Sequence, residues 1–207
     1  RLQKICPAEN ILIVTNKNYK ALCQKQLADV VVKNILCEPV MRNTAPCIAY
    51  AAFKIHSENP DANMIIAASD HIITKEDEFV RVVNDCLELS AANDVLLTIG
   101  ITPSRPDTGY GYIQFTEKGL VGHKKVRKVK TFTEKPNQEL ALNFLDSGDF
   151  LWNSGMFVWS AKSITLAYRK HLNDIYTVFE EGKLLYNTEK EEEYIDRVFP
   201  GCKNISI

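Results

Sequence analysis

The sequence contains no long apolar run, no signal-peptide pattern and no strong net charge. Crossing a bilayer takes roughly 20 consecutive apolar residues, and no stretch approaches that length. With 45% hydrophobic residues, 25% charged residues and a mean hydropathy of −0.17, the composition is that of an ordinary globular protein. The cytosol is the expected compartment, and we expect no membrane partner.

A net charge of −1 provides no general basic field for nucleic acid. We therefore expect no nucleic-acid partner, and any recognition of phosphate must be local. The cysteines occur singly, without the paired spacing of a zinc site or a disulfide framework, which favours buried free thiols. They are residues 6, 23, 37, 47, 86 and 202.

Short apolar runs alternate with helical patterns through the first hundred residues. This alternation predicts βαβ crossovers and an α/β fold, Rossmann-like, with a mixed, mostly parallel sheet and helices on both faces. The expected strands are 10–15, 34–39, 64–69 and 94–101, and the helical patterns between them are 19–27, 43–57 and 79–87.

After Pro103 the predicted strands become longer. The segments 108–115 and 124–136 are expected to join at a turn through Gly119 and Gly122, and the last elements are a helix over 139–148, a strand over 150–160 and helices over 161–198. Without repeats or linkers, residues 1–207 are interpreted as one domain. Because Arg1 falls inside a helical pattern and 202–207 looks like the start of a strand, we expect this domain to be incomplete at both termini.

Asp70 follows the predicted strand 64–69, in "MIIAASDHII". Ligands of open parallel sheets bind beyond the carboxyl ends of the strands, where a carboxylate can hold Mg²⁺ against nucleotide phosphates. The alternative is an aspartate that caps the following loop.

Arg42, Asn43 and Thr44 precede the helical pattern at 43–57. The free backbone N–H groups at that helix start could receive an anion or a base edge. The alternative is a capped helix with an exposed arginine.

Polar groups and glycines interrupt three later strand patterns. Gly109 and Gly111 flank Tyr110, which suits either a bulge or a close approach to a ligand. Glu134 and Lys135 could be a solvated strand end. Asn153 lies among large apolar neighbours and needs hydrogen-bond partners or a ligand.

Taken in order, these segments resemble one family. "EPVMRNTAP", "SDH", "RPDTGYGYIQF", "KTFTEKP" and "FLWNSGMFVW" are similar to the motif series of the bacterial mannose-1-phosphate guanylyltransferases, a branch of the sugar-nucleotide pyrophosphorylases. The resemblance covers nearly the whole chain. It implies the nucleotide-diphospho-sugar transferase type of α/β fold and a reaction in which GTP and mannose 1-phosphate give GDP-mannose and pyrophosphate.

The resemblance also implies roles for individual residues. Mg²⁺ is the implied cofactor, with Asp70 as its ligand, and Asp70 and Lys135 are the implied catalytic residues. GTP and mannose 1-phosphate are the implied partners, and a homodimer is left open. The implied nucleotide-binding positions are Arg42, Asn43, Thr44, Ser69 and Asp70, and the implied sugar-phosphate positions are Tyr110, Gly111, Glu134, Lys135 and Asn153.

Two family features are absent from this sequence: the glycine-rich loop that cradles the triphosphate, and a later aspartate that completes the metal site. Two alternatives therefore remain beside the guanylyltransferase. One is a noncatalytic regulatory protein that binds a nucleotide sugar, and the other is a pyrophosphorylase for another sugar 1-phosphate or nucleotide.

Overall fold

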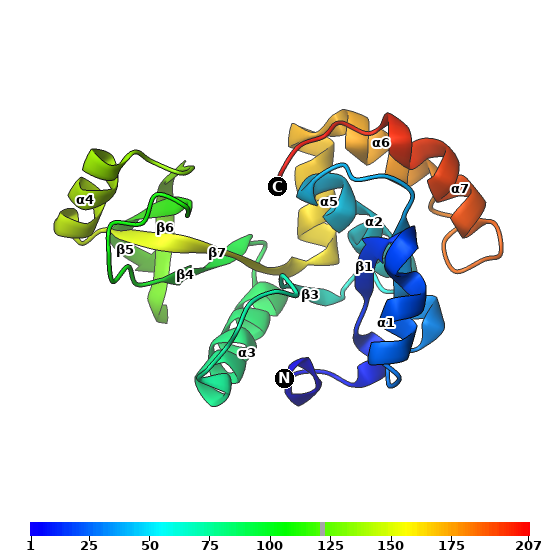
Figure 1. The fold of residues 1–207 in the computed structure, drawn as a ribbon, viewed down its shortest axis with the longest axis horizontal. Coiled ribbons are helices and arrows are strands. Elements are labelled where there is room, and N and C mark those ends of the chain that lie inside the picture. The colour runs from blue at the N-terminus through cyan, green and yellow to red at the C-terminus, as the bar shows by residue number, and fades with distance from the viewer. Residues whose placement is uncertain (121–122) are drawn as a thin grey trace. The chain divides into compact units, whose positions relative to one another are not determined.

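The computed structural model describes the backbone of residues 1–120 and 123–207; the side chains at 118, 120 and 123–125 lie outside the description. Gly122, part of the predicted turn, is therefore outside the described residues. The chain divides into two compact units (Figure 1). Unit 1 consists of Arg1–Ile65, Asp70–Leu96 and Val158–Ile207, and unit 2 of Ile66–Ser69 and Leu97–Phe157. The interpretation of 1–207 as one domain stays a prediction.

Unit 1 contains a βαβ element near its amino end. Strand β1 (Ile13–Asn16) and strand β2 (Ile35–Glu38) pair in parallel, and helix α1 (Lys20–Gln26) lies in the connection. The apolar residues of β2 are buried, whereas those of β1 are only partly buried. The predicted strand–helix–strand order is confirmed, although β1 is shorter than the apolar run that predicted it.

The helices of unit 1 pack around α2 (Thr44–Glu58). Its neighbours are α5 (Ala161–His171) and α6 (Asn173–Glu181), and the chain continues into α7 (Glu191–Val198). Phe53 of α2 lies 5.6–6.2 Å, ring centre to ring centre, from Tyr168, Tyr176 and Phe179. Aromatic pairs at this spacing stabilise a core beyond the area they bury, so this cluster holds the helices together. Helix α3 (Glu76–Ala92) also belongs to unit 1.

A buried ion pair joins α2 to the start of α7. The Nζ of Lys54 lies 2.6 Å from Oε2 of Glu191, and the Tyr50 hydroxyl donates to Oε1 at 2.7 Å. The backbone N–H of Asn187 donates to Oε2 at 2.6 Å. Both charged residues are more than nine-tenths buried. Glu191 is thus held by three donors, two from one face of α2 and one from the turn before α7.

The larger sheet has the order β3-β7-β5-β6, and β4 also pairs with β7. Its strands are β3 (Asn63–Ile66), β4 (Leu97–Ile101), β5 (Tyr112–Leu120), β6 (His123–Thr133) and β7 (Phe150–Ser160). Strand β5 pairs antiparallel with both β6 and β7. The mixed α/β class is confirmed, and the antiparallel β5–β6 pair follows from two long strands that are adjacent in sequence.

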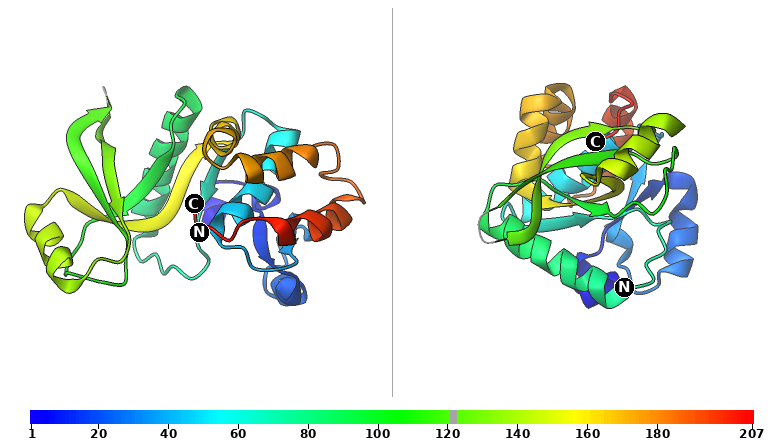
Figure 2. Two further views of the ribbon diagram at one scale, coloured as in Figure 1. Left: turned by 90° about the horizontal axis from the view of Figure 1, so that it is seen from above. Right: turned by 90° about the vertical axis from the view of Figure 1, so that its left-hand side faces the viewer.

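Helix α4 (Gln138–Ser147) belongs to unit 2, close to β5 (Figure 2). Tyr112, Ala141, Phe150 and Trp152 form a buried cluster to which Phe144 adds its ring. The helix ends at Gly148, whose φ of 75° is the left-handed conformation that glycine adopts at low cost. This confirms the predicted stop signal.

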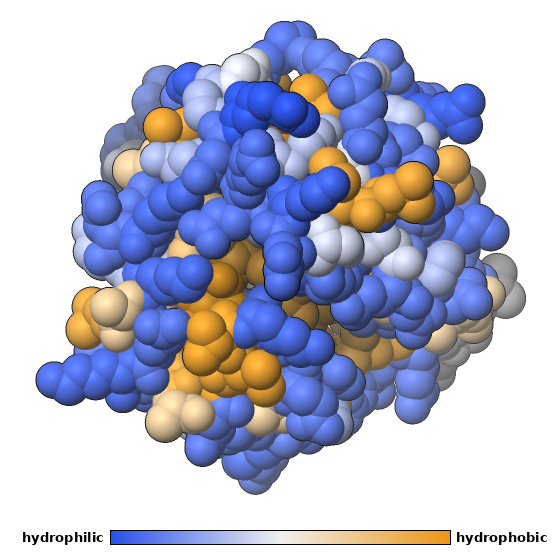
Figure 3. Space-filling model, turned by 90° about the vertical axis from the view of Figure 1, so that its right-hand side faces the viewer, coloured by the Kyte–Doolittle hydropathy of each residue, from blue (hydrophilic) through white to orange (hydrophobic). Residues whose placement is uncertain are grey.

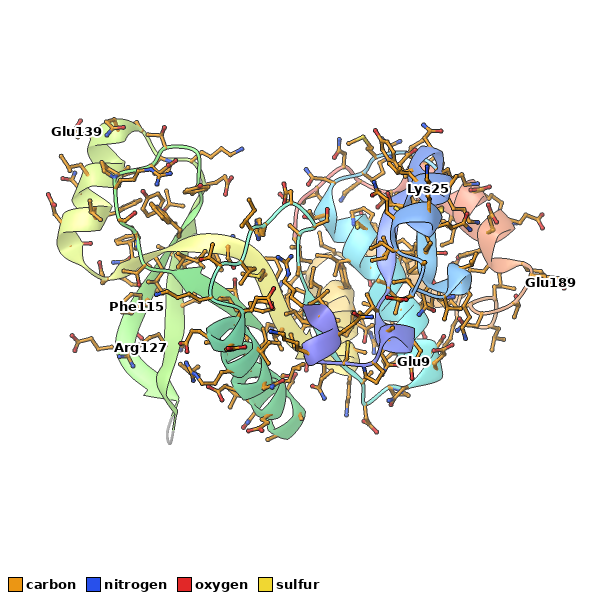
Figure 4. All side chains as sticks on the ribbon, turned by 60° about the horizontal axis from the view of Figure 1, so that its bottom comes forward. Glu9, Lys25, Phe115, Arg127, Glu139 and Glu189 are labelled. Atoms are coloured by element: carbon orange, nitrogen blue, oxygen red, sulfur yellow. The ribbon has the colours of Figure 1, made fainter. Side chains whose placement is uncertain are left out.

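The face in Figure 3 is mostly hydrophilic, with apolar residues gathered in a few patches. In Figure 4 the side chains of Glu139, on α4, and Glu189, before α7, project outward, and both residues are exposed. All six cysteines are free, as predicted, but only Cys37 and Cys202 are buried, and the other four are half-buried.

We predict that Glu191→Gln lowers the free energy of unfolding by about 3–5 kcal/mol, because the Lys54 ammonium loses its counter-charge in a buried environment. Urea unfolding measures the loss. Replacing Lys54 and Glu191 together by methionine should recover part of it, since no charge is then left unpaired.

The matched control is Asp174→Asn, which breaks the exposed 2.7 Å pair between Asp174 and Lys203. It should cost much less, because solvent screens that pair. Equal losses in the Glu191 and Asp174 variants would contradict a structural role for the buried pair.

Candidate functional site

The strand register of unit 2 brings three of the predicted sugar-phosphate positions together. Tyr112 pairs with Thr133 of β6 and with Trp152 of β7. In antiparallel pairs, moving one residue back on one strand moves one residue forward on each partner. Gly111 is therefore opposite both Glu134 and Asn153.

Contacts at this position agree with the register. The backbone N–H of Asn153 donates to the Gly111 carbonyl at 2.8 Å. A Cβ added at Gly111 would lie 2.7 Å from Oε2 of Glu134 and 3.6 Å from Cβ of Asn153. A side chain at position 111 would thus press on the Glu134 carboxylate and make only ordinary van der Waals contact with Asn153, so glycine leaves the carboxylate room beside the strand.

The side-chain oxygen of Asn153 has hydrogen-bond partners within the protein, whereas its NH₂ group has none among the described residues. Its Oδ1 accepts from the Thr98 hydroxyl at 3.3 Å and from the Gly155 N–H at 3.1 Å. Its Nδ2 group makes no hydrogen bond with the part of the chain that the structure describes. The amide is oriented by protein and keeps two donors for another partner.

Glu134 and Lys135 are exposed at the end of β6. Their side chains are 72% and 66% exposed, and Nζ of Lys135 lies 3.9 Å from Oε1 of Glu134. Lys135 has a φ of 42°, in the left-handed region, and precedes the buried Pro136. A non-glycine residue in that conformation carries strain that often marks functional segments. Both charges are available to a ligand.

Tyr110 lies in a loop that packs on Trp152. The two ring centres are 5.0 Å apart, and the Arg105 guanidinium is 5.3 Å from the centre of the Trp152 ring. Arg105 also donates to Asp107 at 2.9 and 2.6 Å. Arg105 and Asp107 were not singled out from the sequence. The Arg-x-Asp spacing next to a glycine-containing turn was a signal for an ion pair within this loop.

Unit 1 holds the predicted positions Arg42, Asn43 and Thr44 at the start of α2. The Arg42 guanidinium donates from two nitrogens to the carbonyl of Pro200. The Thr44 N–H donates to Oδ1 of Asn43, and the Thr44 hydroxyl accepts from the N–H of Ile207. The segment near the carboxyl end of the chain therefore lies against these residues.

The expectation of free N–H groups at the start of this helix is wrong. Thr44 N–H bonds to the Asn43 side chain, Ala45 N–H bonds to the Ile205 carbonyl at 3.0 Å, and Pro46 has no N–H. These donors already have acceptors. An anion placed here would therefore have to bind to side chains, such as the Arg42 guanidinium, and not to backbone N–H groups of the helix.

Asn43 has an unusual backbone, with φ 65° and ψ −171°. A non-glycine residue there costs on the order of 1–3 kcal/mol and persists where the surroundings fix it. The bonds of Thr44 and Ala45, which follow it, provide that restraint. The strain at Asn43 and at Lys135 falls within two of the segments that carry the resemblance.

Next to this segment lies a carboxyl group that the sequence did not single out. Oε1 of Glu38, the last residue of β2, is buried without a hydrogen-bond partner among the described residues. Burial raises the pKa of Glu38, and burial followed by the Glu38 charge raises the pKa of Cys47 to about 12. Both groups are therefore biased toward their neutral forms.

Ser69 and Asp70 lie in a loop rather than at a strand end. Strand β3 ends at Ile66, and it is the terminal strand of its sheet path, not a central one. Ser69 is exposed, and the Asp70 side chain is 86% exposed, with His71 Nε2 at 4.0 Å. Arg1 fixes the next residue by donating to the His71 carbonyl at 2.7 Å.

Asp70 provides a single carboxylate for a metal. The described residues contain no group of three His, Cys, Asp or Glu side chains that could hold an ion. Mg²⁺ commonly binds through one or two carboxylates together with substrate phosphates and water. Asp70 fits an ion of that kind, held mainly by a nucleotide, and does not fit a cage made of protein ligands.

Comparisons with known proteins place these features in a family context. Residues 4–197 match the model of a family described as nucleotidyl transferase. The chain is 37% identical over 205 residues to a mannose-1-phosphate guanylyltransferase of Escherichia coli K12, covering 96% of this chain and 43% of that protein. It is 35% identical over 167 residues to the alginate biosynthesis protein AlgA of Pseudomonas putida, covering 80% and 34%. The chain thus spans less than half the length of these relatives.

Two solved structures have a similar fold. A protein of Thermus thermophilus, described as a mannose-1-phosphate geranyltransferase, superposes with a TM-score of 0.85 at 22% identity, covering 100% of this chain and 56% of that one. A Helicobacter pylori protein described as mannose-6-phosphate isomerase gives 0.74 at 25% identity, covering 95% and 75%. In the described part of this chain, no helix has the length and apolar character needed to cross a membrane.

We predict that Gly111→Ala costs less than about 1 kcal/mol of stability, because the exposed Glu134 carboxylate can rotate away from the new methyl group. Gly100→Ala should cost about 1–3 kcal/mol, because its Cβ would lie 2.5 Å from Cδ1 and 2.9 Å from Cβ of Leu151. Urea unfolding of both variants provides the test. A larger loss for Gly111→Ala than for Gly100→Ala would mean that Glu134 is rigidly held.

Proposed function

The chain belongs to the nucleotidyl transferase family, and we propose that the protein is a mannose-1-phosphate guanylyltransferase, which forms GDP-mannose and pyrophosphate from GTP and mannose 1-phosphate. The observation that carries the proposal is the convergence of Gly111, Glu134 and Asn153 at one register of β5. These are the positions that the family resemblance assigns to the sugar phosphate. The relatives named for this reaction support the choice of substrates.

On the sugar-phosphate side, the residues offer complementary hydrogen-bonding groups. The Glu134 carboxylate can accept from two sugar hydroxyls, and the Nδ2 group of Asn153 can donate to a third oxygen. Tyr110 adds an aromatic surface that is 44% exposed. Lys135, beside Glu134, offsets the phosphate charge. Together these groups hold the sugar and orient its phosphate oxygen.

On the nucleotide side, Asp70 is proposed as the ligand of Mg²⁺, with Ser69 beside it. An ion held there together with the nucleotide would supply charge neutralisation for the phosphates. Arg42, Asn43 and Thr44 are proposed to contact the guanine nucleotide through their side chains. Because the α2 backbone donors have partners already, this contact depends on charge and side-chain shape.

The reaction requires little covalent chemistry from the protein. An oxygen of the sugar phosphate attacks the α-phosphorus of GTP in line, a new P–O bond forms, and the bond to pyrophosphate breaks. No covalent enzyme intermediate is involved. Positioning and charge neutralisation supply the acceleration in such reactions, which matches a set of residues without an activated nucleophile.

A noncatalytic protein that binds a nucleotide sugar is the second candidate. One observation favours it: among the described residues, Asp70 is not part of any group of three His, Cys, Asp or Glu side chains that could hold a metal ion. Such a protein would bind GDP-mannose without releasing pyrophosphate. A pyrophosphorylase with another nucleotide or sugar is distinguished by substrate preference.

The first test is pyrophosphate release by the full-length protein with Mg²⁺ and mannose 1-phosphate, comparing GTP with UTP and ATP. We expect release with GTP, and a fall of about a hundredfold or more in Asp70→Asn, because the carboxylate that anchors the ion is lost. Asp146→Asn, an exposed aspartate of α4, is the matched control and should retain activity. GDP-mannose binding without release from any nucleotide would support the regulatory candidate instead.

The second test addresses the sugar. In Glu134→Gln, the ratio of kcat/KM for mannose 1-phosphate over glucose 1-phosphate should fall by about tenfold or more. The reason is that one of the two acceptor oxygens of the carboxylate is replaced by an NH₂ group, which cannot accept a hydrogen bond from a sugar hydroxyl. Glu139→Gln, an exposed position of α4, should leave the ratio unchanged. An unchanged ratio in Glu134→Gln would remove Glu134 from sugar recognition.

A further inference from the structure

Arg105 contacts an aromatic ring on one side and a carboxylate on the other, and we call this arrangement of Trp152, Arg105 and Asp107 the bracket. Its guanidinium lies 5.3 Å from the centre of the Trp152 ring and donates through Nε and Nη2 to Oδ2 of Asp107. A guanidinium can stack on an aromatic face and bind a carboxylate at the same time, because it is planar and carries several donors. Arg105 thereby ties the loop to strand β7.

Asp107 passes this restraint along the loop. Its Oδ1 accepts from the Gly109 N–H at 2.8 Å, and its carbonyl accepts from the Tyr112 hydroxyl at 2.9 Å. The Gly109 hydrogen bond and the Arg105 guanidinium hold the pKa of Asp107 below its usual range. Since Tyr112 is fully buried at the start of β5, the loop is fixed at both ends.

The residues fixed in this way are neighbours of the proposed sugar-phosphate positions. Tyr110 packs on Trp152 at 5.0 Å, and Gly111 follows it. Asn153 follows Trp152 on β7 and bonds to Gly111. Arg105 therefore interacts directly with Tyr110, and Gly111 and Asn153 lie one residue beyond its contacts Tyr110 and Trp152.

A purely structural role for Arg105 is a weak explanation of this arrangement. Its side chain is 59% exposed, and its ion pair is with a residue only two positions away. Exposed local pairs contribute little to global stability. The bracket orders a short loop instead, and order established before binding lowers the entropy that a ligand must overcome.

We propose that Arg105 is a positioning residue of the sugar-phosphate site, which it serves by holding Trp152 and Asp107 so that Tyr110 and Gly111 face the sugar in a fixed geometry. This inference rests on the proposed function. It assigns Arg105 no contact with the reacting atoms. Its loss should weaken binding of the sugar phosphate while leaving GTP binding and the chemical step much less affected.

The experiment compares Arg105→Ala, Arg105→Lys and the control Arg169→Ala in the full-length protein; Arg169 is exposed on α5 of unit 1. For Arg105→Ala, the KM for mannose 1-phosphate should rise about tenfold. The KM for GTP and kcat should change less than about twofold. Arg105→Lys should recover only part of the loss, because an ammonium keeps the charge but not the planar fork. Arg169→Ala should match the wild type.

A spectroscopic measurement tests the bracket itself. In a Trp159→Phe background, Trp152 is the remaining tryptophan, and Arg105→Ala should increase quenching of its emission by acrylamide. Thermal unfolding checks that each variant folds, and the kinetic comparison in the unmodified background does not depend on the Trp159 substitution.

The outcomes separate the two proposals. A wild-type protein that makes GDP-mannose, with an Arg105→Ala variant whose KM for mannose 1-phosphate is unchanged, overturns the role of Arg105 alone. Equal changes in both KM values also overturn it, since they indicate a general structural defect. A wild-type protein that releases no pyrophosphate with any nucleotide overturns the proposed function, and the inference about Arg105 with it.

Discussion

The pairing of β5 with two antiparallel neighbours is the constraint on which the candidate site depends. Because Tyr112 pairs with Thr133 on one side and with Trp152 on the other, Gly111 must meet residues 134 and 153. No long-range electrostatic attraction is needed to bring the glutamate and the asparagine together. The buried cluster around Tyr112 keeps this register, since a shift by one residue would turn its ring away from the core.

Unit 1 is organised by a different kind of interaction. Its helices meet in an aromatic cluster, and the buried Glu191 collects donors from α2 and from the turn before α7. Burial together with the Glu191 charge raises the pKa of Tyr50, so its hydroxyl stays a donor. The motif residues Arg42 and Thr44 are held by a later part of the same chain. In unit 1, the segment that carries the family resemblance is therefore restrained by residues outside the motifs, whereas in unit 2 residues of the motifs restrain one another.

Much of the fold could be predicted from the sequence, because it depends on local patterns. The strand–helix alternation, the cap of α4 and the long later strands follow from periodicity and from residues such as Gly148. The start of α2 was predicted less well. The donor groups there are used by Ile205 and, through the Asn43 side chain, by the helix itself. A contact between residues 45 and 205 leaves no trace in either local sequence.

The candidate site shows the same division. Glu134 and Asn153 could be selected by their chemistry and by resemblance, but their proximity follows from a register that local sequence does not specify. Arg105 was overlooked because its partners, Asp107 and Trp152, are informative only when the loop is seen against β7. Asp70 lies four residues beyond β3 and not directly at a strand end. The reason is that β3 ends at Ile66, although the apolar composition of the sequence predicts a strand up to residue 69.

The two units also differ in how their sequence is distributed, and this bears on the order in which the protein can form during synthesis. Apart from Ile66–Ser69, unit 2 is one continuous segment, Leu97–Phe157, so its strands can pair as soon as that segment has left the ribosome. Unit 1 needs contacts between residues far apart, such as Tyr50 with Glu191 and Thr44 with Ile207. Such distant contacts close large loops and form slowly. The helices around α2 must therefore wait for the carboxyl-terminal segment of unit 1, while Gly111, Glu134 and Asn153 can already have met.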